Sequence, residues 1–249
     1  MGGAHASALG DVYAALIERG KAVDIAPLER LLTDHDTEVR RAALGALGNV
    51  YPRLIERGEV VDVTALEAHL VNRDEKVQMA LVTALGSVYI ALLDHEVVPS
   101  FSKIERALSS EFLGVRKTAA NVLSAVYPAL IMHGKAIDLA QIEMGLDGLI
   151  DYIRQATIEA LGIIYPALIR AGVEVDLPRL EAGLNDEYWA VRQATVEALS
   201  NIYPALIQRS EDVDLKGLEA TLKDRSWVVR NRERTRRRLR STHCTWQIG

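Results

Sequence analysis

Apolar residues between positions 39 and 51 recur with the period of an α-helix. Hydrophobic side chains stand at 39, 43, 46, 47 and 50, so one face of a helix with about 3.6 residues per turn is apolar. Asp36 precedes the segment in the position of an N-cap, and Glu38 lies in the first turn, where a negative charge is favourable. The pattern therefore predicts an amphipathic helix over 39–51.

The residues after position 51 predict a break and two further helices. Proline disfavours α geometry at the residue before it and suits a first helical position, so a short helix is predicted over Pro52–Arg57, ending at Gly58. Asp62 can cap a third helix that runs through Leu66 and Leu70. The same capping column holds Asp24, Ser100, Asp138, Asp176 and Asp214. No segment alternates as a strand does, so the sequence predicts an all-α protein.

The chain repeats this unit every 38 residues without insertion or deletion. A tyrosine column comprises Tyr13, Tyr51, Tyr89, Tyr127, Tyr165 and Tyr203. Leucine, glutamate and valine columns comprise Leu9, Leu47, Leu85, Leu123, Leu161 and Leu199; Glu29, Glu67, Glu105, Glu143, Glu181 and Glu219; and Val39, Val77, Val115, Ile153, Val191 and Val229. The predicted repeats are 1–38, 39–76, 77–114, 115–152, 153–190 and 191–228. In repeats one and three, Ala14 and Ile90 replace proline, and the first two helices are expected to continue as one kinked helix.

Such a unit has apolar residues on more than one face and cannot cover them alone. Stacked neighbours cover each other, so we expect a single stack over residues 1–230 with a continuous core. A column of small residues supports close approach between neighbours: Gly10, Gly48, Gly86, Ser124, Gly162 and Ser200. Glycine inside a helix costs about 1 kcal/mol relative to alanine, so its recurrence predicts that a neighbouring group lies against it.

These residues carry a family resemblance. Asp186, Val191-Arg192, Ala194 and Ala198-Leu199 follow a pattern that resembles HEAT-like repeats, most closely the short subtype known from phycobilisome lyases. The predicted extra helix beginning at the proline is similar to the three-helix armadillo unit. The resemblance covers 1–230 and implies a right-handed α-solenoid of six repeats, with a concave face lined by the Val-Arg helices. It implies no single function, because this superfamily contains mostly scaffolds and adaptors, with a few enzymes and nucleic-acid binders.

Three polar columns allow a structural and a functional interpretation. The glutamate column and an arginine column can form ladders along the stack, because the guanidinium fork suits bidentate pairing. The alternative is an arginine strip for an acidic ligand. The tyrosines can pack their rings and satisfy their hydroxyls, or they can form a stacking platform. We favour the structural interpretation for all three. The arginine column comprises Arg40, Arg116, Arg154, Arg192 and Arg230, with Gln78 as the exception.

One stripe on the Val-Arg helices varies between repeats, and we call it the variable stripe. Its residues are four apart and therefore share a helix face: Arg41, Gly45, Asn49, Met79, Thr83, Ser87, Lys117, Asn121, Ala125, Gln155, Glu159, Ile163, Gln193, Glu197 and Asn201. Either this is a solvated polar face or it is a groove that binds a partner. The partner-binding candidates are Arg41, Asn49, Lys117, Asn121, Gln155, Glu159, Gln193, Glu197 and Asn201.

The turns before the Val-Arg helices offer a second candidate surface. Aromatic residues are only 5% of the chain, yet several gather in these turns. Exposed aromatics along one edge are typical of an interaction site, whereas inward-facing ones would fill gaps between repeats. We call this set the apolar edge: Phe112, Tyr152, Tyr188, Trp189 and Trp227.

Charge is distributed unevenly along the chain. Residues 1–229 contain 22 basic and 33 acidic side chains, whereas residues 230–249 contain seven arginines and one glutamate. An acidic body disfavours general binding to phosphate backbones. Repetition stops at Arg230, and such an abrupt change is typical of a frayed or out-of-frame segment over 231–249; a basic interaction arm is the alternative. Met1 and Gly2 occupy the valine and arginine columns, as expected for a piece of a longer array.

The sequence contains no recognisable catalytic constellation. The histidines share no column or ligand spacing, and one cysteine, Cys244, excludes an internal disulfide. We therefore expect no catalytic residue, cofactor or metal, but a scaffold that binds a protein or peptide through its concave face. The alternatives are a bilin-lyase-like enzyme and, less favoured, a nucleic-acid binder akin to HEAT-like DNA-alkylation glycosylases. No apolar stretch reaches 18 residues and no signal peptide is visible, so a cytoplasmic protein without a membrane segment is expected.

Overall fold

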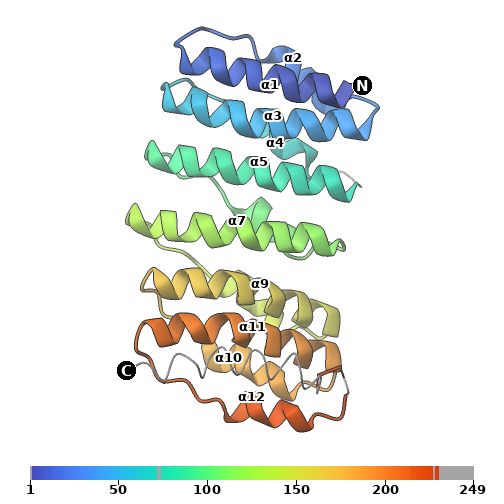
Figure 1. Cartoon of the computed structure of the whole chain (residues 1–249), viewed down its shortest axis with the longest axis vertical. Helices are drawn as coiled ribbons and strands as arrows, with labels where there is room; N and C mark the ends of the chain where they lie inside the picture. The colour runs from blue at the N-terminus through green and yellow to red at the C-terminus, as the bar shows by residue number, and fades with distance from the viewer. Residues whose placement is uncertain (1, 72–73, 227, 230–249) are drawn as a thin grey trace. The chain divides into compact units, whose positions relative to one another are not determined.

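The structure is a computed structural model that describes residues 2–71, 74–226 and 228–229. It contains two compact units, Met1–Ala136 and Ile137–Gly249. Every regular element of the described residues is a helix, which confirms the all-α prediction (Figure 1). The single domain over 1–230, the right-handed superhelix and its concave face stay predictions. Segment 231–249 lies outside the described residues.

The first unit is a row of long helices backed by short ones (Figure 1). The long helices are α1 (Gly2–Glu18), α3 (Thr37–Glu56), α5 (Glu75–Asp94) and α7 (Leu113–Met132). Between them come α2 (Ala26–Arg30), η1 (Leu31–Thr33), α4 (Val63–Glu67), η2 (Ala68–Val71) and α6 (Ser102–Ala107). Each long helix packs against the next long helix along the chain.

The second unit repeats the arrangement. Its long helices, α9 (Asp151–Arg170) and α11 (Trp189–Gln208), pack against each other. The short helices are α8 (Ala140–Glu143), η3 (Met144–Asp147), α10 (Leu177–Glu181), η4 (Ala182–Asn185), α12 (Lys216–Ala220) and η5 (Thr221–Lys223). From α3 to α11 the long helices start at residues 37, 75, 113, 151 and 189, so the 38-residue period of the sequence is the period of the structure.

The predicted break before proline is wrong. Pro52 lies inside the continuous helix α3, and Pro128, Pro166 and Pro204 lie inside α7, α9 and α11. An internal proline costs about 3 kcal/mol, but burial of Leu54 and Ile55 beyond it contributes about 1.5–3 kcal/mol for each side chain. Continuing the helix therefore stabilises more than the lost hydrogen bond costs. Each repeat has one long and one short helix rather than the three-helix armadillo unit.

The predicted caps hold at Asp36, Asp62 and Asp176, whereas α2, α6, α8 and α12 begin one residue later than predicted. Asp36 Oδ1 accepts the backbone N–H of Glu38 at 2.8 Å, and Asp62 Oδ1 accepts that of Thr64 at 2.9 Å. The short helices then continue as tight 3₁₀ turns, as α4 does into η2. These caps fix where each helix of the pair begins, and so set the position of the side chains described below.

Close approach of neighbouring helices occurs at the small column, as predicted. A Cβ built on Gly48 would lie 2.9 Å from Cα of Ala84 on the next long helix, and one on Gly162 would lie 2.8 Å from Cα of Ala198. These distances exclude any larger side chain without a shift of backbone. Glycine is kept there because the long helices touch.

Helix α5 is both long and strongly apolar. Its 20 residues are long and apolar enough to cross a membrane by length and composition alone, although charged and polar residues interrupt the apolar sequence. However, 56% of its most apolar window is buried inside the structure, where α5 packs between α3 and α7. This is the environment of a core helix.

Candidate functional site

The tyrosine and glutamate columns are bonded to each other. In each case the tyrosine hydroxyl of a long helix donates to a carboxylate oxygen of the glutamate 22 residues earlier, on the preceding short helix. The pairs are Tyr51–Glu29 at 2.7 Å, Tyr89–Glu67 at 2.5 Å, Tyr127–Glu105 at 2.9 Å, Tyr165–Glu143 at 2.7 Å and Tyr203–Glu181 at 2.8 Å. All five tyrosines are buried, so they join the layers of the fold and offer no stacking platform.

These bonds keep the tyrosines neutral. Burial, followed by the hydrogen bond to glutamate, raises the pKa of Tyr51, Tyr89, Tyr165 and Tyr203 above the ordinary tyrosine value. A buried tyrosinate beside a carboxylate would be doubly unfavourable, because both charges are negative and neither is well solvated. The columns are therefore committed to structure.

The arginine column forms bidentate bridges in the second unit. Arg154 donates through Nε and Nη2 to the two carboxylate oxygens of Asp186 at 2.7 and 3.0 Å. Arg192 binds Asp224 in the same way at 2.6 and 2.9 Å, with side chains only 5% and 9% exposed. The bonds from Arg192 hold the pKa of Asp224 below its usual range. We call each Arg–Asp pair a rung.

In the first unit, the arginines of this column bond the backbone of the preceding turn. Arg40 Nη1 donates to the carbonyl oxygens of Asp34 and His35 at 2.7 and 2.9 Å, and Arg116 Nη1 bonds the equivalent carbonyls at 3.0 and 3.2 Å. Arg154 and Arg192 make the same kind of carbonyl bond. Each arginine therefore also holds the turn before its own helix, which supports the structural interpretation of this column.

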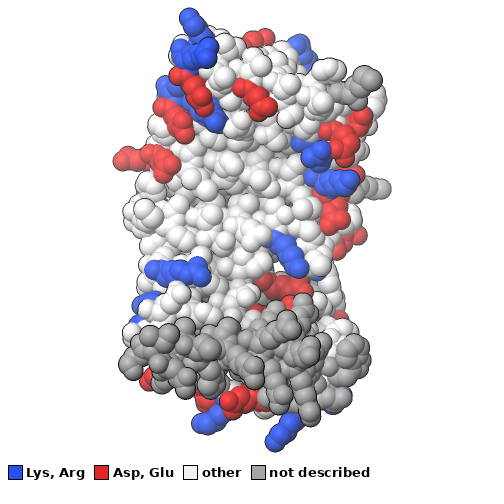
Figure 2. Space-filling model, viewed as in Figure 1, with Lys and Arg blue, Asp and Glu red and all other residues white. Residues whose placement is uncertain are grey.

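The variable stripe of the first unit faces solvent, and its middle is hollowed. Two surface hollows, of about 440 and 360 Å³, lie between α3 and α5, and both are lined by Gly45, Ala80 and Thr83. Over these helices the charged side chains gather toward the helix ends and leave the middle mostly uncharged (Figure 2). The smaller hollow presents small polar and apolar groups, whereas the larger one is also lined by Glu38, Arg41 and Lys76.

The predicted stripe residues of this unit differ in how they are engaged. Arg41 pairs with Glu38 at 2.6 Å, and Asn49 accepts a hydrogen bond from Arg53. Lys117 and Asn121 on α7 are exposed. Arg41 and Asn49 therefore have intramolecular partners, whereas the two α7 side chains extend the stripe into solvent.

In the second unit the stripe is more engaged. Gln155 Nε2 donates to Glu159 Oε1 at 2.9 Å, and Gln193 donates to Glu197 at 2.8 Å. These four side chains are half-buried, and Asn201 is exposed. The sequence predicts the shared face but not these pairs, which tie polar groups to one another at a spacing of four residues.

The apolar edge is exposed in the second unit. Tyr188 and Trp189 are 45% and 50% exposed. Leu149 and Ile150, just before α9, and Tyr152, in its first turn, are exposed as well. The Arg154 guanidinium lies 5.6 Å from the Tyr188 ring centre. Phe112, in the first unit, is half-buried, and Trp227 lies outside the described residues. These exposed side chains do not fill gaps between repeats.

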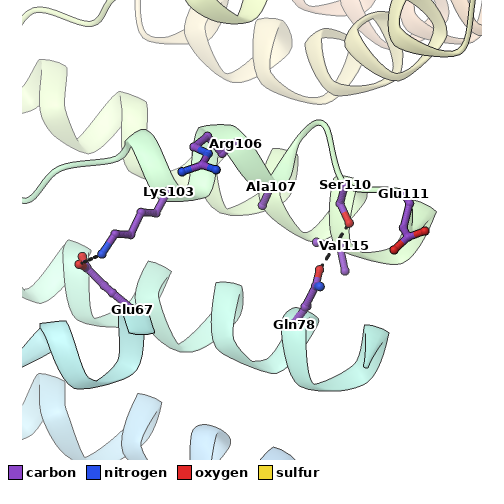
Figure 3. Close-up of a pocket in the computed structure, with 8 residues that line it drawn as sticks. All are labelled: Glu67, Gln78, Lys103, Arg106, Ala107, Ser110, Glu111 and Val115. Atoms are coloured by element: carbon purple, nitrogen blue, oxygen red, sulfur yellow. Dashed lines mark hydrogen bonds and ion pairs between the residues drawn. The ribbon is translucent and has the colours of Figure 1, made fainter. Parts of the chain in front are cut away.

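A cavity of about 420 Å³ in the first unit involves residues absent from the predicted set (Figure 3). It lies at Gln78, the exception in the arginine column, and at Ser110, which stands where Asp186 and Asp224 stand in later repeats. The sequence signal was available, because two columns depart from the pattern together. Among the described residues, no group of three or more His, Cys, Asp or Glu side chains is placed to hold a metal ion.

One protein family matches two segments of the chain. The HEAT repeat family model matches residues 25–54 and 177–206, two segments that are four periods apart. No curated protein sequence matches the chain. A designed armadillo repeat protein is 19% identical over 88% of this chain and 100% of its own, with a TM-score of 0.41. Two engineered proteins each align over 89% of this chain and over 98% and 99% of theirs, at 19% and 21% identity and TM-scores of 0.41 and 0.43.

Repeated pairs of a short and a long helix define an α-helical repeat protein. Both matched segments contain such a pair, α2 with α3 and α10 with α11. The chain therefore contains HEAT-like repeats at residues 25–54 and 177–206. The comparisons do not extend to the lyase-type subtype.

Proposed function

We propose that this protein is a non-enzymatic scaffold that binds a protein or peptide along the variable stripe of its long helices. The observation that carries the proposal is the pair of hollows between α3 and α5, lined by stripe residues. HEAT-like repeat proteins are mostly scaffolds and adaptors, and the fold by itself names no partner.

The columns that hold the fold together are distinct from the exposed residues of the stripe, which supports this proposal. The tyrosine, glutamate, arginine and small columns are occupied by bonds and contacts that hold the fold. Thr83, Lys117 and Asn121 lie on the same side of the long helices but are exposed. These positions can change without loss of packing, so they are the positions at which a binding specificity can be built.

The chemistry of the stripe suits a peptide or protein surface. Lys117 supplies a cation, Asn121 and Thr83 supply donors and acceptors, and Met79 supplies a flexible apolar group. Such a mixture favours specific polar contacts around a small apolar centre rather than the uniform positive charge that a nucleic acid requires. The acidic body of the chain is consistent with this preference.

The test uses the partner recovered from native lysate and two stripe variants. Thr83→Arg fills both hollows, and Lys117→Glu reverses the exposed charge. Each is expected to weaken partner binding by about tenfold or more, since hot spots lose at least about 1–2 kcal/mol on disruption. Circular dichroism should show unchanged helix content.

Matched controls lie on exposed positions elsewhere in the same unit. Val60→Arg adds the same bulk and charge as Thr83→Arg, and Lys135→Glu reverses the same charge as Lys117→Glu. Both controls are expected to bind as the unaltered protein does. Equal losses in the control and stripe variants, or no loss in either stripe variant, would contradict the proposal.

A further inference from the structure

The cavity between the short helices of the first unit is built from four elements. Glu67 ends α4, Gln78 lies on α5, Lys103 and Arg106 lie on α6, and Ser110 precedes α7 (Figure 3). Its volume of about 420 Å³ is within the range of small-molecule sites. It is separate from the hollows of the variable stripe, with which it shares no lining residue.

The cavity exists because a rung is missing. At the equivalent position in the second unit, Arg154 and Asp186 form a bidentate bridge between successive repeats. In the first unit, Gln78 and Ser110 replace both members of that pair, and Ser110 Oγ donates to Gln78 Oε1 at 3.4 Å. The shorter side chains leave open the space that a guanidinium and a carboxylate occupy in the later repeat.

Two cations lie at one end of this cavity. Lys103 is held by Glu67, and Glu67 also accepts the hydroxyl of Tyr89 at 2.5 Å. The carboxylate of the Tyr89–Glu67 pair thus orients the Lys103 ammonium group, which has further hydrogens to donate. Arg106 extends toward Lys103 in Figure 3, and no carboxylate of the described residues pairs with its guanidinium.

The cation pair is particular to this repeat. Position 106 corresponds to Ala68, Ala182 and Ala220 in other repeats, and position 103 to Ala65 and Gly217. Only here do a lysine and an arginine coincide with a missing rung. An arginine fork presents two parallel N–H donors that match a carboxylate. Arg106 is exposed and the Lys103 side chain is 41% exposed, so a ligand can reach both cations from solvent.

We propose that this cavity binds a small molecule that carries one carboxylate group. The carboxylate lies between the Arg106 guanidinium and the Lys103 ammonium, and the remainder of the molecule extends toward Gln78 and Ser110. With Glu67 and Glu111 also on the wall, the four charged groups sum to zero. The wall has no excess of positive charge, so one carboxylate leaves less uncompensated negative charge there than a doubly charged phosphate would.

The test follows the Arg106 Nε–H resonance of the full-length protein by NMR while butyrate or inorganic phosphate is added at constant ionic strength. Butyrate is expected to give a saturable shift at one site, and phosphate a weaker one. Arg106→Ala should weaken butyrate binding by about tenfold, measured on the backbone amides around Ser110. Folding should be unaffected, because alanine stands at this column in other repeats.

Two further variants separate the site from general attraction of anions. Gln78→Arg combined with Ser110→Asp rebuilds the rung, fills the cavity and should abolish the butyrate shifts. Arg30→Ala removes the same residue from the same column in the first repeat, where Pro27 stands in place of Lys103, and should leave butyrate binding unchanged. The proposal is overturned by absence of a saturable butyrate shift, by equal effects of Arg30→Ala and Arg106→Ala, or by butyrate binding that survives Arg106→Ala. Phosphate binding as tight as butyrate binding would overturn the carboxylate assignment.

Discussion

Replacing Glu96 by glycine should stabilise the protein. The second residue after each long helix has a positive φ: 72° at Gly20, 80° at Gly58, 69° at Gly134 and 87° at Gly172, but also 63° at Glu96 and 60° at Ser210. The hydrogen bonds are the same in both cases. Gly58 N–H donates to Ile55 O at 2.8 Å, and Glu96 N–H donates to Leu93 O at 2.9 Å. Glu96 thus holds the glycine conformation with a side chain attached.

The magnitude follows from two opposing terms. A residue with a Cβ in the left-handed region costs about 1–2 kcal/mol. Glycine loses more backbone freedom on folding, which offsets about 0.5–1 kcal/mol of that gain. The net expectation for Glu96→Gly is about 0.5–1 kcal/mol of added stability. A Cβ built on Gly58 meets nothing within 4 Å, so Gly58→Ala should lose a similar amount through backbone conformation alone.

Urea unfolding followed by circular dichroism measures both changes. Glu96→Ala is the control, because it removes the charge of the glutamate but keeps the Cβ. The reasoning predicts that glycine at 96 is more stable than alanine at 96, and that the two variants have equal slopes against urea. Alanine as stable as glycine at position 96 would refute it.

Three further predictions concern the ladders and the C-terminal segment. Asp224→Asn should cost about 1.5–3 kcal/mol in urea unfolding at pH 7, because the buried Arg192 loses its carboxylate and keeps only its bonds to the turn carbonyls; a loss below about 1 kcal/mol would contradict this. Because the pKa of Asp224 is lowered in the folded state, this carboxylate stabilises the fold above the unfolded pKa of about 3.9, and the stabilisation is lost as the pH falls through the folded pKa. Below about pH 4, the free energy of unfolding should therefore change less with pH in Asp224→Asn than in the unaltered protein. The raised tyrosine pKa has the opposite sign: stability is present below about pH 10 and is lost above it, so absorbance should show these tyrosines ionising only as the chain unfolds, and ionisation with the helix content intact would disagree. The tyrosines are Tyr51, Tyr89, Tyr165 and Tyr203. Removal of 231–249 should leave the melting temperature unchanged or raised if that segment is frayed or out of frame, and a large drop would show that it caps the stack instead.

The repetition in the sequence was sufficient for much of the fold. Helix periodicity, the Asp36 and Asp62 caps and the close approach at Gly48 follow from local rules that act the same way in every repeat. The predicted break at Pro52 is wrong because burial of side chains on both sides of the proline stabilises the continuous helix more than the proline destabilises it. Tertiary packing decides that competition, and a sequence window does not contain it.

Less of the candidate site than of the fold could be predicted from the sequence. The stripe follows from helical spacing, but its half-burial at Glu159 and its hollows at Thr83 depend on how adjacent helices pack. The cavity depends on two substitutions, at Gln78 and Ser110, that are 32 residues apart and meet only in the fold. Gln78 departs visibly from the arginine column, but the sequence alone does not show that the two side chains meet or that a cavity opens beside them.

The central claim is that the variable stripe of the long helices is the surface that binds a partner. Site-specific photo-crosslinking tests this most directly, with benzoylphenylalanine placed at Thr83 or Asn121 on the stripe, or at Trp189 on the apolar edge, in cells that express the protein. The account predicts that one partner is crosslinked from both stripe positions and not from position 189. Crosslinking from position 189, with neither stripe position reacting, would place the partner on the apolar edge and contradict the account.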